Sequence, residues 1–172
     1  VITSDGELAL RIRMIANHGG LEKYQHEVVG RNSRLDEIQS MVLSLKLPKL
    51  SEWTAQRQQN AHQYMTHLHE VGDIVVPSTY PGRPSVYHQF VVRTGARDDL
   101  RNSLHKAGVE TGIHYPRAIT DLPAFTPGIN SPKPVNASQW SNEILSLPVA
   151  EHLSSTDIEY VARTIAGFFR ER

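Results

Sequence analysis

The sequence predicts an α/β chain in two parts: a helical segment, then a small α+β domain with a short, mainly antiparallel sheet and flanking helices. Up to Gly72, apolar residues recur three or four positions apart, which is the spacing of helices that bury one face. After Gly72, short runs rich in β-branched and aromatic residues lie between turns that contain Pro and Gly, as strands do. We therefore place a boundary there, with residues 1–72 in one region and residues 73–172 in the small C-terminal domain.

The composition excludes several classes of function. Lys and Arg number 18, as do Asp and Glu, so the formal net charge is zero, and we expect no nucleic-acid partner. No apolar run approaches the roughly 18 residues that span a bilayer, and no signal peptide opens the chain, so we expect no membrane partner either. The absence of cysteine excludes disulfides and thiolate chemistry, and it fits a cytoplasmic protein.

The first predicted helix follows Ser4-Asp5-Gly6-Glu7, which is a capping-box pattern, and carries Leu8, Ile12 and Ile15 at helical spacing. It should end at Asn17-His18-Gly19-Gly20, where glycine can adopt the left-handed conformation. Residues 1–3 read as the end of a strand, so we expect the chain to be part of a longer protein.

Two further helices are expected in the first region. The second helix follows a polar loop, residues 20–32, and its apolar face comprises Leu35, Ile38, Val42 and Leu45. Pro48 should bend or end this helix, because proline cannot donate the next helical hydrogen bond. A long helix should then cover about residues 50–71, with an apolar stripe of Leu50, Ala61, Tyr64, Leu68 and Val71.

The small domain is built from short segments. Three runs should be strands: residues 73–77, 86–93 and 109–115. Three amphipathic stretches should be helices: residues 97–107, 137–145 and 155–170. Residues 116–136 contain five prolines and should form a long loop, a kind of segment that often carries function.

The turn Gly30-Arg31-Asn32-Ser33-Arg34 concentrates hydrogen-bond donors just before the second helix. One interpretation is an anion site, because the N-terminal end of a helix attracts negative charge. The other is ordinary capping by Asn32 or Ser33, with the arginines in water or paired with acidic residues that follow. The local pattern leaves both open.

A second candidate region is Gly112-Ile113-His114-Tyr115-Pro116, where a predicted strand runs into the proline-rich loop. Positions of this kind often line pockets, and here they would deliver an imidazole and a phenol. The alternative is a half-buried His and Tyr in a turn, which is the usual burial of both residue types.

The sequence gives little support for a metal site or for a catalytic lysine. Nine histidines are present, but those on the long helix lack the spacing of three or four residues that suits a metal, so we expect no metal site. A Schiff-base lysine needs a desolvated amine, and the five lysines look like surface residues. We therefore expect no catalytic residue within this chain.

Five stretches, taken in order, resemble the DegT/DnrJ/EryC1/StrS family of sugar aminotransferases that depend on pyridoxal 5'-phosphate (PLP). They are VITSDGELALRIRMIANHGG, VGRNSRLDEIQSMVLSLKLPKLSEWTAQR, VYHQFVVR, AGVETGIHYP and ILSLPVAEHLSSTDIEYV. The resemblance covers nearly the whole chain. It implies the C-terminal part of a fold type I aminotransferase, with the end of the large PLP-binding domain and its dimer helices in residues 1–72.

The resemblance also implies roles for the two candidate regions. Asn32 would reach across a homodimer and bind the PLP phosphate of the neighbouring subunit. Arg34 would support that turn or contact the substrate, and His114 with Tyr115 would contact substrate or shape the active site. The substrate would be a nucleotide-linked keto-sugar, and the amino donor a compound such as glutamate.

The lysine that holds PLP in this family would precede Val1, so PLP would be bound mainly by a missing N-terminal domain and this chain alone should be inactive. Thr120 and Leu122 stand where many members have a histidine and a glutamine, which leaves the sugar, the donor and the regiochemistry open. The rival hypothesis is a catalytically inactive, stand-alone module that is derived from the family and keeps only its dimerisation surface.

Overall fold

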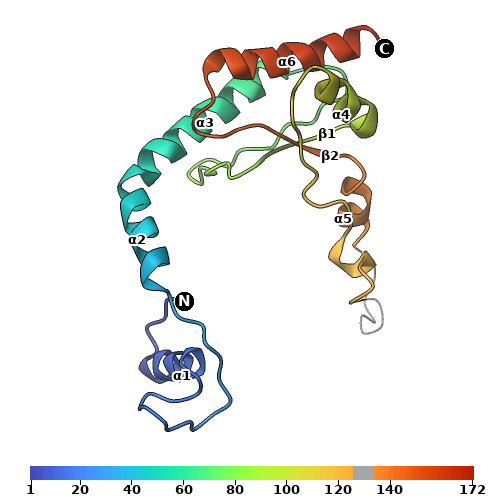
Figure 1. Cartoon of the computed structure of the whole chain (residues 1–172). Coiled ribbons are helices and arrows are strands. Elements are labelled where there is room, and N and C mark those ends of the chain that lie inside the picture. The colour runs from blue at the N-terminus through green and yellow to red at the C-terminus, as the bar shows by residue number, and fades with distance from the viewer. Residues whose placement is uncertain (126–133) are drawn as a thin grey trace. The chain divides into compact units, whose positions relative to one another are not determined.

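A computed structural model describes residues 1–125 and 134–172 of the chain (Figure 1). These residues form two compact units, Val1–Lys49 and Leu50–Arg172, and each is described by itself. Part of the predicted loop 116–136 lies outside the described residues.

The first unit begins with helix α1, Gly6–Ala16. Its N-cap is Asp5, whose Oδ1 accepts a hydrogen bond from the Leu8 N–H at 3.0 Å. The expected capping box is therefore displaced by one residue from Ser4, because a carboxylate at the cap satisfies a free N–H of the first turn. The helix ends at Asn17, and Gly19 has the positive φ of 92° that the following turn requires.

Helix α2, Glu37–Lys46, leads directly into the short 3-10 helix η1, Leu47–Lys49. Its N-cap is Asp36, so the expectation that Asn32 or Ser33 caps this helix is wrong. Residues 31–33 instead pair with the end of α1, where the N–H groups of Arg31 and Ser33 donate to the carbonyls of Ile15 and Ala16 at 2.8 and 2.9 Å. The last carbonyls of a helix lack partners within it, and this extended segment provides them.

The second unit is organised around helix α3, Leu50–His67, which packs against helix α6, Ser155–Arg170. Strand β1, Phe90–Arg93, pairs antiparallel with β2, Ile144–Leu147, so that Phe90 faces Leu147. Helix α4, Arg97–Lys106, also contacts α6. Their apolar side chains form one core that includes Tyr64, Leu68, Phe90, Val92, Leu100, Leu104, Leu145, Ile158 and Ile165.

The antiparallel sheet is confirmed, but it has fewer residues in strands than the sequence predicts. Segments 73–77 and 109–115 contribute only the single bridges of Val75 to Arg93 and of Gly112 to Ser146. The helix expected at 137–145 is the shorter α5, Val135–Trp140, followed by β2. Three of the four β2 residues are buried, so the strand lacks the alternation that reveals a half-exposed one. A short 3-10 helix, η2, Ile119–Asp121, lies within the predicted loop.

The boundary between the compact units precedes α3, whereas the sequence predicts a domain boundary near residue 72. Helix α3 belongs to the second unit because Ala61, Tyr64 and the adjoining Leu68 pack into its core. The division into residues 1–72 and 73–172 remains a prediction about the complete protein.

Candidate functional site

The turn that contains Asn32 is held by backbone contacts to the end of α1. Asn32 forms an isolated antiparallel bridge with Asn17, and the His18 N–H donates to the Arg31 carbonyl at 3.0 Å. Gly30 lies so close to the backbone of His18 and Gly19 that a Cβ atom there would overlap it. Glycine at position 30 is therefore required for the approach that fixes Asn32.

The Asn32 side chain is exposed, and the oxygen and nitrogen of its amide differ in their hydrogen bonds. Its Oδ1 accepts a hydrogen bond from Nε of Arg34 at 3.1 Å. Among the described residues, no acceptor is bound to its N–H₂ group, which therefore remains available to a ligand. We expected the N-terminus of the second helix to attract an anion to this turn. Helix α2 begins later, at Glu37, so the turn does not lie at the helix N-terminus.

His114 lines a groove of about 300 Å³ in the second unit. Its Nδ1 is 2.8 Å from Oγ of Ser146 on β2, and its ring lies over Gly112, where a Cβ would collide with the imidazole. Tyr115 is 72% exposed and meets the His114 ring edge to face, with 5.6 Å between centroids. His114 is thus anchored at one nitrogen, while the Tyr115 phenol is open to solvent.

One residue that lines this groove, Arg57, forms an ion pair that the sequence does not reveal. Nη2 of Arg57 on α3 lies 2.6 Å from Oε2 of Glu151, with one quarter of the Arg57 side chain exposed. The pKa of Glu151 is below its ordinary value, mainly because its own backbone N–H donates to the carboxylate and then because of Arg57. These residues are 94 positions apart, so no local motif could have linked them.

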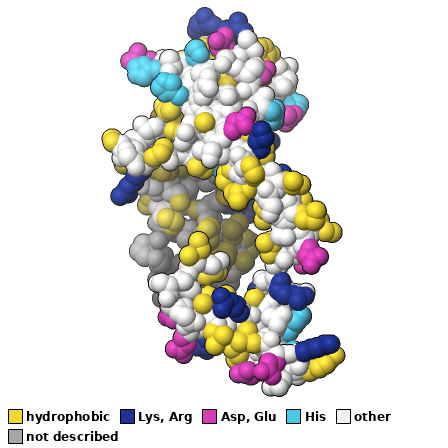
Figure 2. All heavy atoms as spheres, turned by 90° about the vertical axis from the view of Figure 1, so that its left-hand side faces the viewer, with side chains coloured by type: hydrophobic (Ala, Val, Ile, Leu, Met, Phe, Trp, Pro, Cys, Tyr) yellow, Lys and Arg dark blue, Asp and Glu magenta, His cyan; other side chains and the backbone are white. Residues whose placement is uncertain are grey.

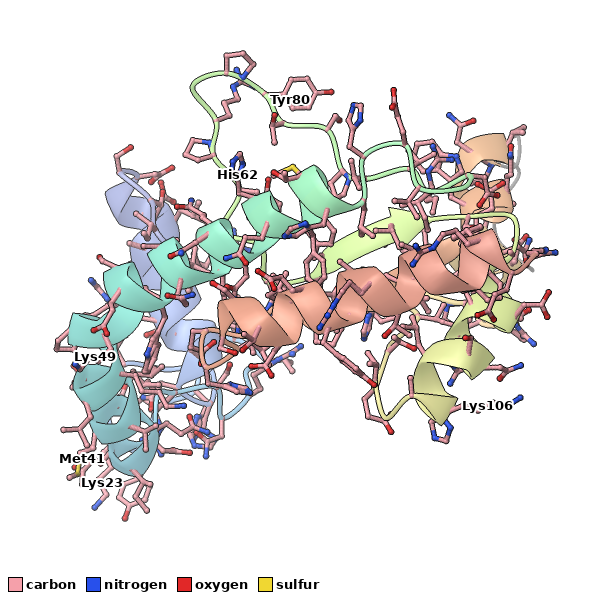
Figure 3. The ribbon with its side chains drawn as sticks, turned by 90° about the horizontal axis from the view of Figure 1, so that it is seen from above. Lys23, Met41, Lys49, His62, Tyr80 and Lys106 are labelled. Atoms are coloured by element: carbon pink, nitrogen blue, oxygen red, sulfur yellow. The ribbon has the colours of Figure 1, made fainter. Side chains whose placement is uncertain are left out.

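A second pocket, of about 620 Å³, lies between α3 and the loop of residues 77–85. His62 of α3 and Tyr80 of the loop both line it, as Figure 3 shows from above. Within the described part of the chain, no group of three or more His, Asp or Glu side chains could hold a metal ion.

The lysines of the described residues, Lys23, Lys46, Lys49 and Lys106, are all exposed. Figure 3 shows Lys106 at the end of α4, with its side chain pointing outward. Lys133 lies outside the described residues. No described lysine therefore has the desolvated setting that a covalent PLP site needs.

Thr120 and Leu122, where we expect a difference from the family pattern, lie at the second residue of η2 and directly after it. The Thr120 hydroxyl is buried without a hydrogen-bond partner among the residues that the structure describes. None of the described helices is long and apolar enough to cross a membrane.

Comparison with known proteins identifies what the chain resembles. The model of the DegT/DnrJ/EryC1/StrS aminotransferase family matches residues 1–166. Over 166 residues, the chain is 42% identical to the "Erythromycin biosynthesis sensory transduction protein EryC1" of Saccharopolyspora erythraea, covering 96% of this chain and 45% of that protein. It is 40% identical to a dTDP-3-amino-3,4,6-trideoxy-alpha-D-glucose transaminase of Streptomyces venezuelae, covering 89% of this chain and 41% of that protein.

Solved structures show the same fold. The X-ray structure of S. venezuelae DesV matches with a TM-score of 0.91 at 36% identity, over 99% of this chain and 46% of that one. A DegT/DnrJ/EryC1/StrS aminotransferase from Brucella abortus matches with a TM-score of 0.90 at 32% identity, over 98% of this chain and 45% of that one. The chain therefore spans less than half the length of these relatives.

Proposed function

Since the chain belongs to the DegT/DnrJ/EryC1/StrS aminotransferase family, we propose that it is the C-terminal part of a PLP-dependent enzyme that aminates a nucleotide-linked keto-sugar. Two relatives more than 30% identical carry names of nucleotide-sugar aminotransferases, one for a dTDP-sugar and one for a UDP-sugar. Glutamate or a similar amino acid would supply the amino group.

The observation that carries this proposal is the N–H₂ group of Asn32, which has no acceptor among the residues that the structure describes. Arg34 binds the oxygen of the amide, and the N–H₂ group presents its donors to a ligand. A phosphate offers only acceptors when it is fully ionised, and hydrogen bonds to a charged group are stronger than neutral ones. The residues present therefore fit the phosphate of PLP, which Asn32 would bind in the neighbouring subunit.

A homodimer would also account for the surface of α2. Its apolar side chains are exposed, with Ile38 at 78%, Met41 at 65% and Leu45 at 76%. Figure 2 shows hydrophobic side chains at the surface beside charged ones. Such a large exposed apolar surface marks a contact with other protein.

PLP supplies the electron-withdrawing chemistry of transamination when it is bound. The tasks of this chain would be to bind and to orient. Asn32 would hold the cofactor phosphate, with Arg34 supporting the amide or contacting the substrate. His114 would contact the sugar nucleotide from the groove, because its imidazole is anchored at Nδ1. Tyr115 would contact it from beside the groove, because its side chain is open to solvent.

The test uses the complete protein, with the two half-reactions followed separately by the absorbance of the cofactor. We expect His114→Asn to lower kcat/KM for amination of the keto-sugar and to leave the reaction with the amino donor largely unchanged, because only contacts to the sugar are lost. His105→Asn is the matched control, since that side chain is 73% exposed on α4.

A parallel fall of both half-reactions, together with a lower melting temperature, would contradict the substrate role of His114. A complete protein that binds no PLP and aminates no nucleotide-linked keto-sugar would refute the enzyme and favour the inactive dimerisation module.

A further inference from the structure

Ser146 occupies a position between two segments of the second unit. On one side it faces Val91 of β1, and on the other its N–H and carbonyl both bond to the backbone of Gly112, at 2.7 and 3.1 Å. The residue is only 7% exposed. Its backbone is therefore fixed, and its side chain can reach few partners.

The hydroxyl of Ser146 meets His114, with 2.8 Å between Oγ and Nδ1. Among the residues that the structure describes, no other hydrogen bond of this hydroxyl is found. A buried hydroxyl without an acceptor is costly, so the hydroxyl should donate to Nδ1. In a neutral imidazole, Nδ1 can accept only if the proton is on Nε2.

Two further contacts hold the imidazole ring of His114 in place. Gly112 leaves room for the imidazole where any side chain would collide with it, and Tyr115 packs against it edge to face. With Nδ1 bound to Ser146, Nε2 is the nitrogen left to a ligand. If Nε2 carries the proton, His114 donates a hydrogen bond to the ligand; if Nε2 carries none, His114 accepts one.

We propose that Ser146 is a positioning residue that keeps His114 in the tautomer with its proton on Nε2, so that the imidazole donates a hydrogen bond to an oxygen of the bound ligand. That the ligand is a nucleotide-linked sugar rests on the function proposed above; the tautomer rests only on the contacts of Ser146. Oxygens of a sugar or a diphosphate are acceptors, as this donor requires.

The first test is nitrogen-15 NMR of the complete protein with labelled histidine, recorded at about pH 9, where imidazole is ordinarily neutral. His114→Asn identifies the signal. We expect a single Nε2–H tautomer for His114, a mixture of tautomers in Ser146→Ala, and a return to the single tautomer in Ser146→Thr, which keeps a hydroxyl. Ser141→Ala is the control, because Ser141 is equally buried and its hydroxyl donates to the Ser138 carbonyl.

The second test is kinetic. Ser146→Ala should slow the sugar half-reaction by roughly 3- to 10-fold, as expected for one hydrogen bond, and leave the amino-donor half-reaction unchanged. An Nδ1–H tautomer in the unmodified protein, or a tautomer unaffected by Ser146→Ala, would overturn the proposal. If the tautomer changes as expected but neither half-reaction does, the positioning by Ser146 stands and the substrate role of His114 fails.

Discussion

Arg34 and Asn32 form one hydrogen-bonded pair, in which Nε of Arg34 donates to Oδ1 of Asn32 at 3.1 Å. Asparagine amides can rotate by half a turn, which exchanges donor and acceptor. Because Arg34 can only donate, it selects the orientation in which the N–H₂ group of Asn32 faces a ligand. The two residues should therefore act together in holding an anion.

Asn32→Ala in the complete protein should weaken the retention of PLP. The loss of a hydrogen bond to a charged group costs about 1.5–3 kcal/mol, which is roughly 10- to 150-fold in affinity. Arg34→Ala should weaken the binding of PLP less. The Asn32 amide is still present in this variant, but Arg34 no longer fixes its orientation. Equilibrium dialysis against PLP measures both, and Ser44→Ala on the exposed surface of α2 is the control.

A mixed dimer tests whether Asn32 acts across the subunit interface. One subunit carries Asn32→Ala and the other lacks the lysine that binds PLP. The intact Asn32 then belongs to the subunit without the lysine, so about one functional site per dimer should survive if the contact is between subunits. A mixed dimer whose remaining lysine-bearing site behaves like the Asn32→Ala homodimer would show that the contact is made within one subunit.

The 172-residue chain by itself should not bind PLP covalently. Its described lysines are exposed, and an exposed ammonium group is a poor nucleophile at neutral pH. Mixing the chain with PLP, reducing with borohydride and measuring the mass should give no stoichiometric product. Modification of one lysine in full yield, with the complete protein as the positive control, would contradict this expectation.

Ile38→Glu should convert the proposed homodimer into monomers. A charge buried in an apolar contact without a partner is costly, so the dissociation constant should rise by about 30-fold or more. Light scattering across a dilution series measures the change. Gln39→Glu introduces the same charge on the neighbouring exposed position of α2 and should leave the dimer intact. Equal behaviour of the two variants would exclude this face of α2 from the interface.

Glu151→Gln should lower the melting temperature in a manner that depends on pH. The pKa of Glu151 is lowered in the folded protein, so its carboxylate stabilises the fold above the ordinary value of 4.5 and ceases to do so as the pH falls through its folded value. At neutral pH we expect a decrease of about 1–4 °C, because a partly exposed ion pair contributes at most about 1 kcal/mol.

The difference between Glu151→Gln and the unmodified protein should therefore shrink below about pH 4.5. Glu110→Gln is the control, since this side chain is 89% exposed and lies 3.9 Å from the His105 imidazole. A difference that persists at low pH would assign the effect to packing and not to the carboxylate charge.

Helical spacing and capping residues were sufficient to predict most of the helices. Ile158, Val161 and Ile165 are buried as their spacing indicates, and Ser154 forms a capping box with Asp157 at the start of α6. The same reasoning failed at α2, where Asn32 and Ser33 look like caps. The backbone N–H groups of Arg31 and Ser33 are used by the end of α1, and such pairing between distant segments leaves no local pattern.

In the candidate site, too, some residues could be predicted from the sequence and others could not. His114 and Tyr115 could be selected because a strand-like run ends there, and Asn32 because donors crowd its turn. Ser146 could not be selected, because β2 is buried on both faces and its residues lack the alternation of a half-exposed strand. Its relation to His114 arises from the bridge to Gly112, which exists only in the folded chain.

The polar anchors of α3 have a consequence for synthesis on the ribosome. Asn60 and Tyr64 are fully buried, and they donate to the carbonyls of Ala150 and Pro148, which are 90 and 84 residues further along the chain. The nascent α3 must therefore wait, with these groups in water, until most of the second unit has been made. Contacts of such long range slow folding and prolong the exposure of apolar surface, so this unit cannot complete its core until residues 148–150 have been made.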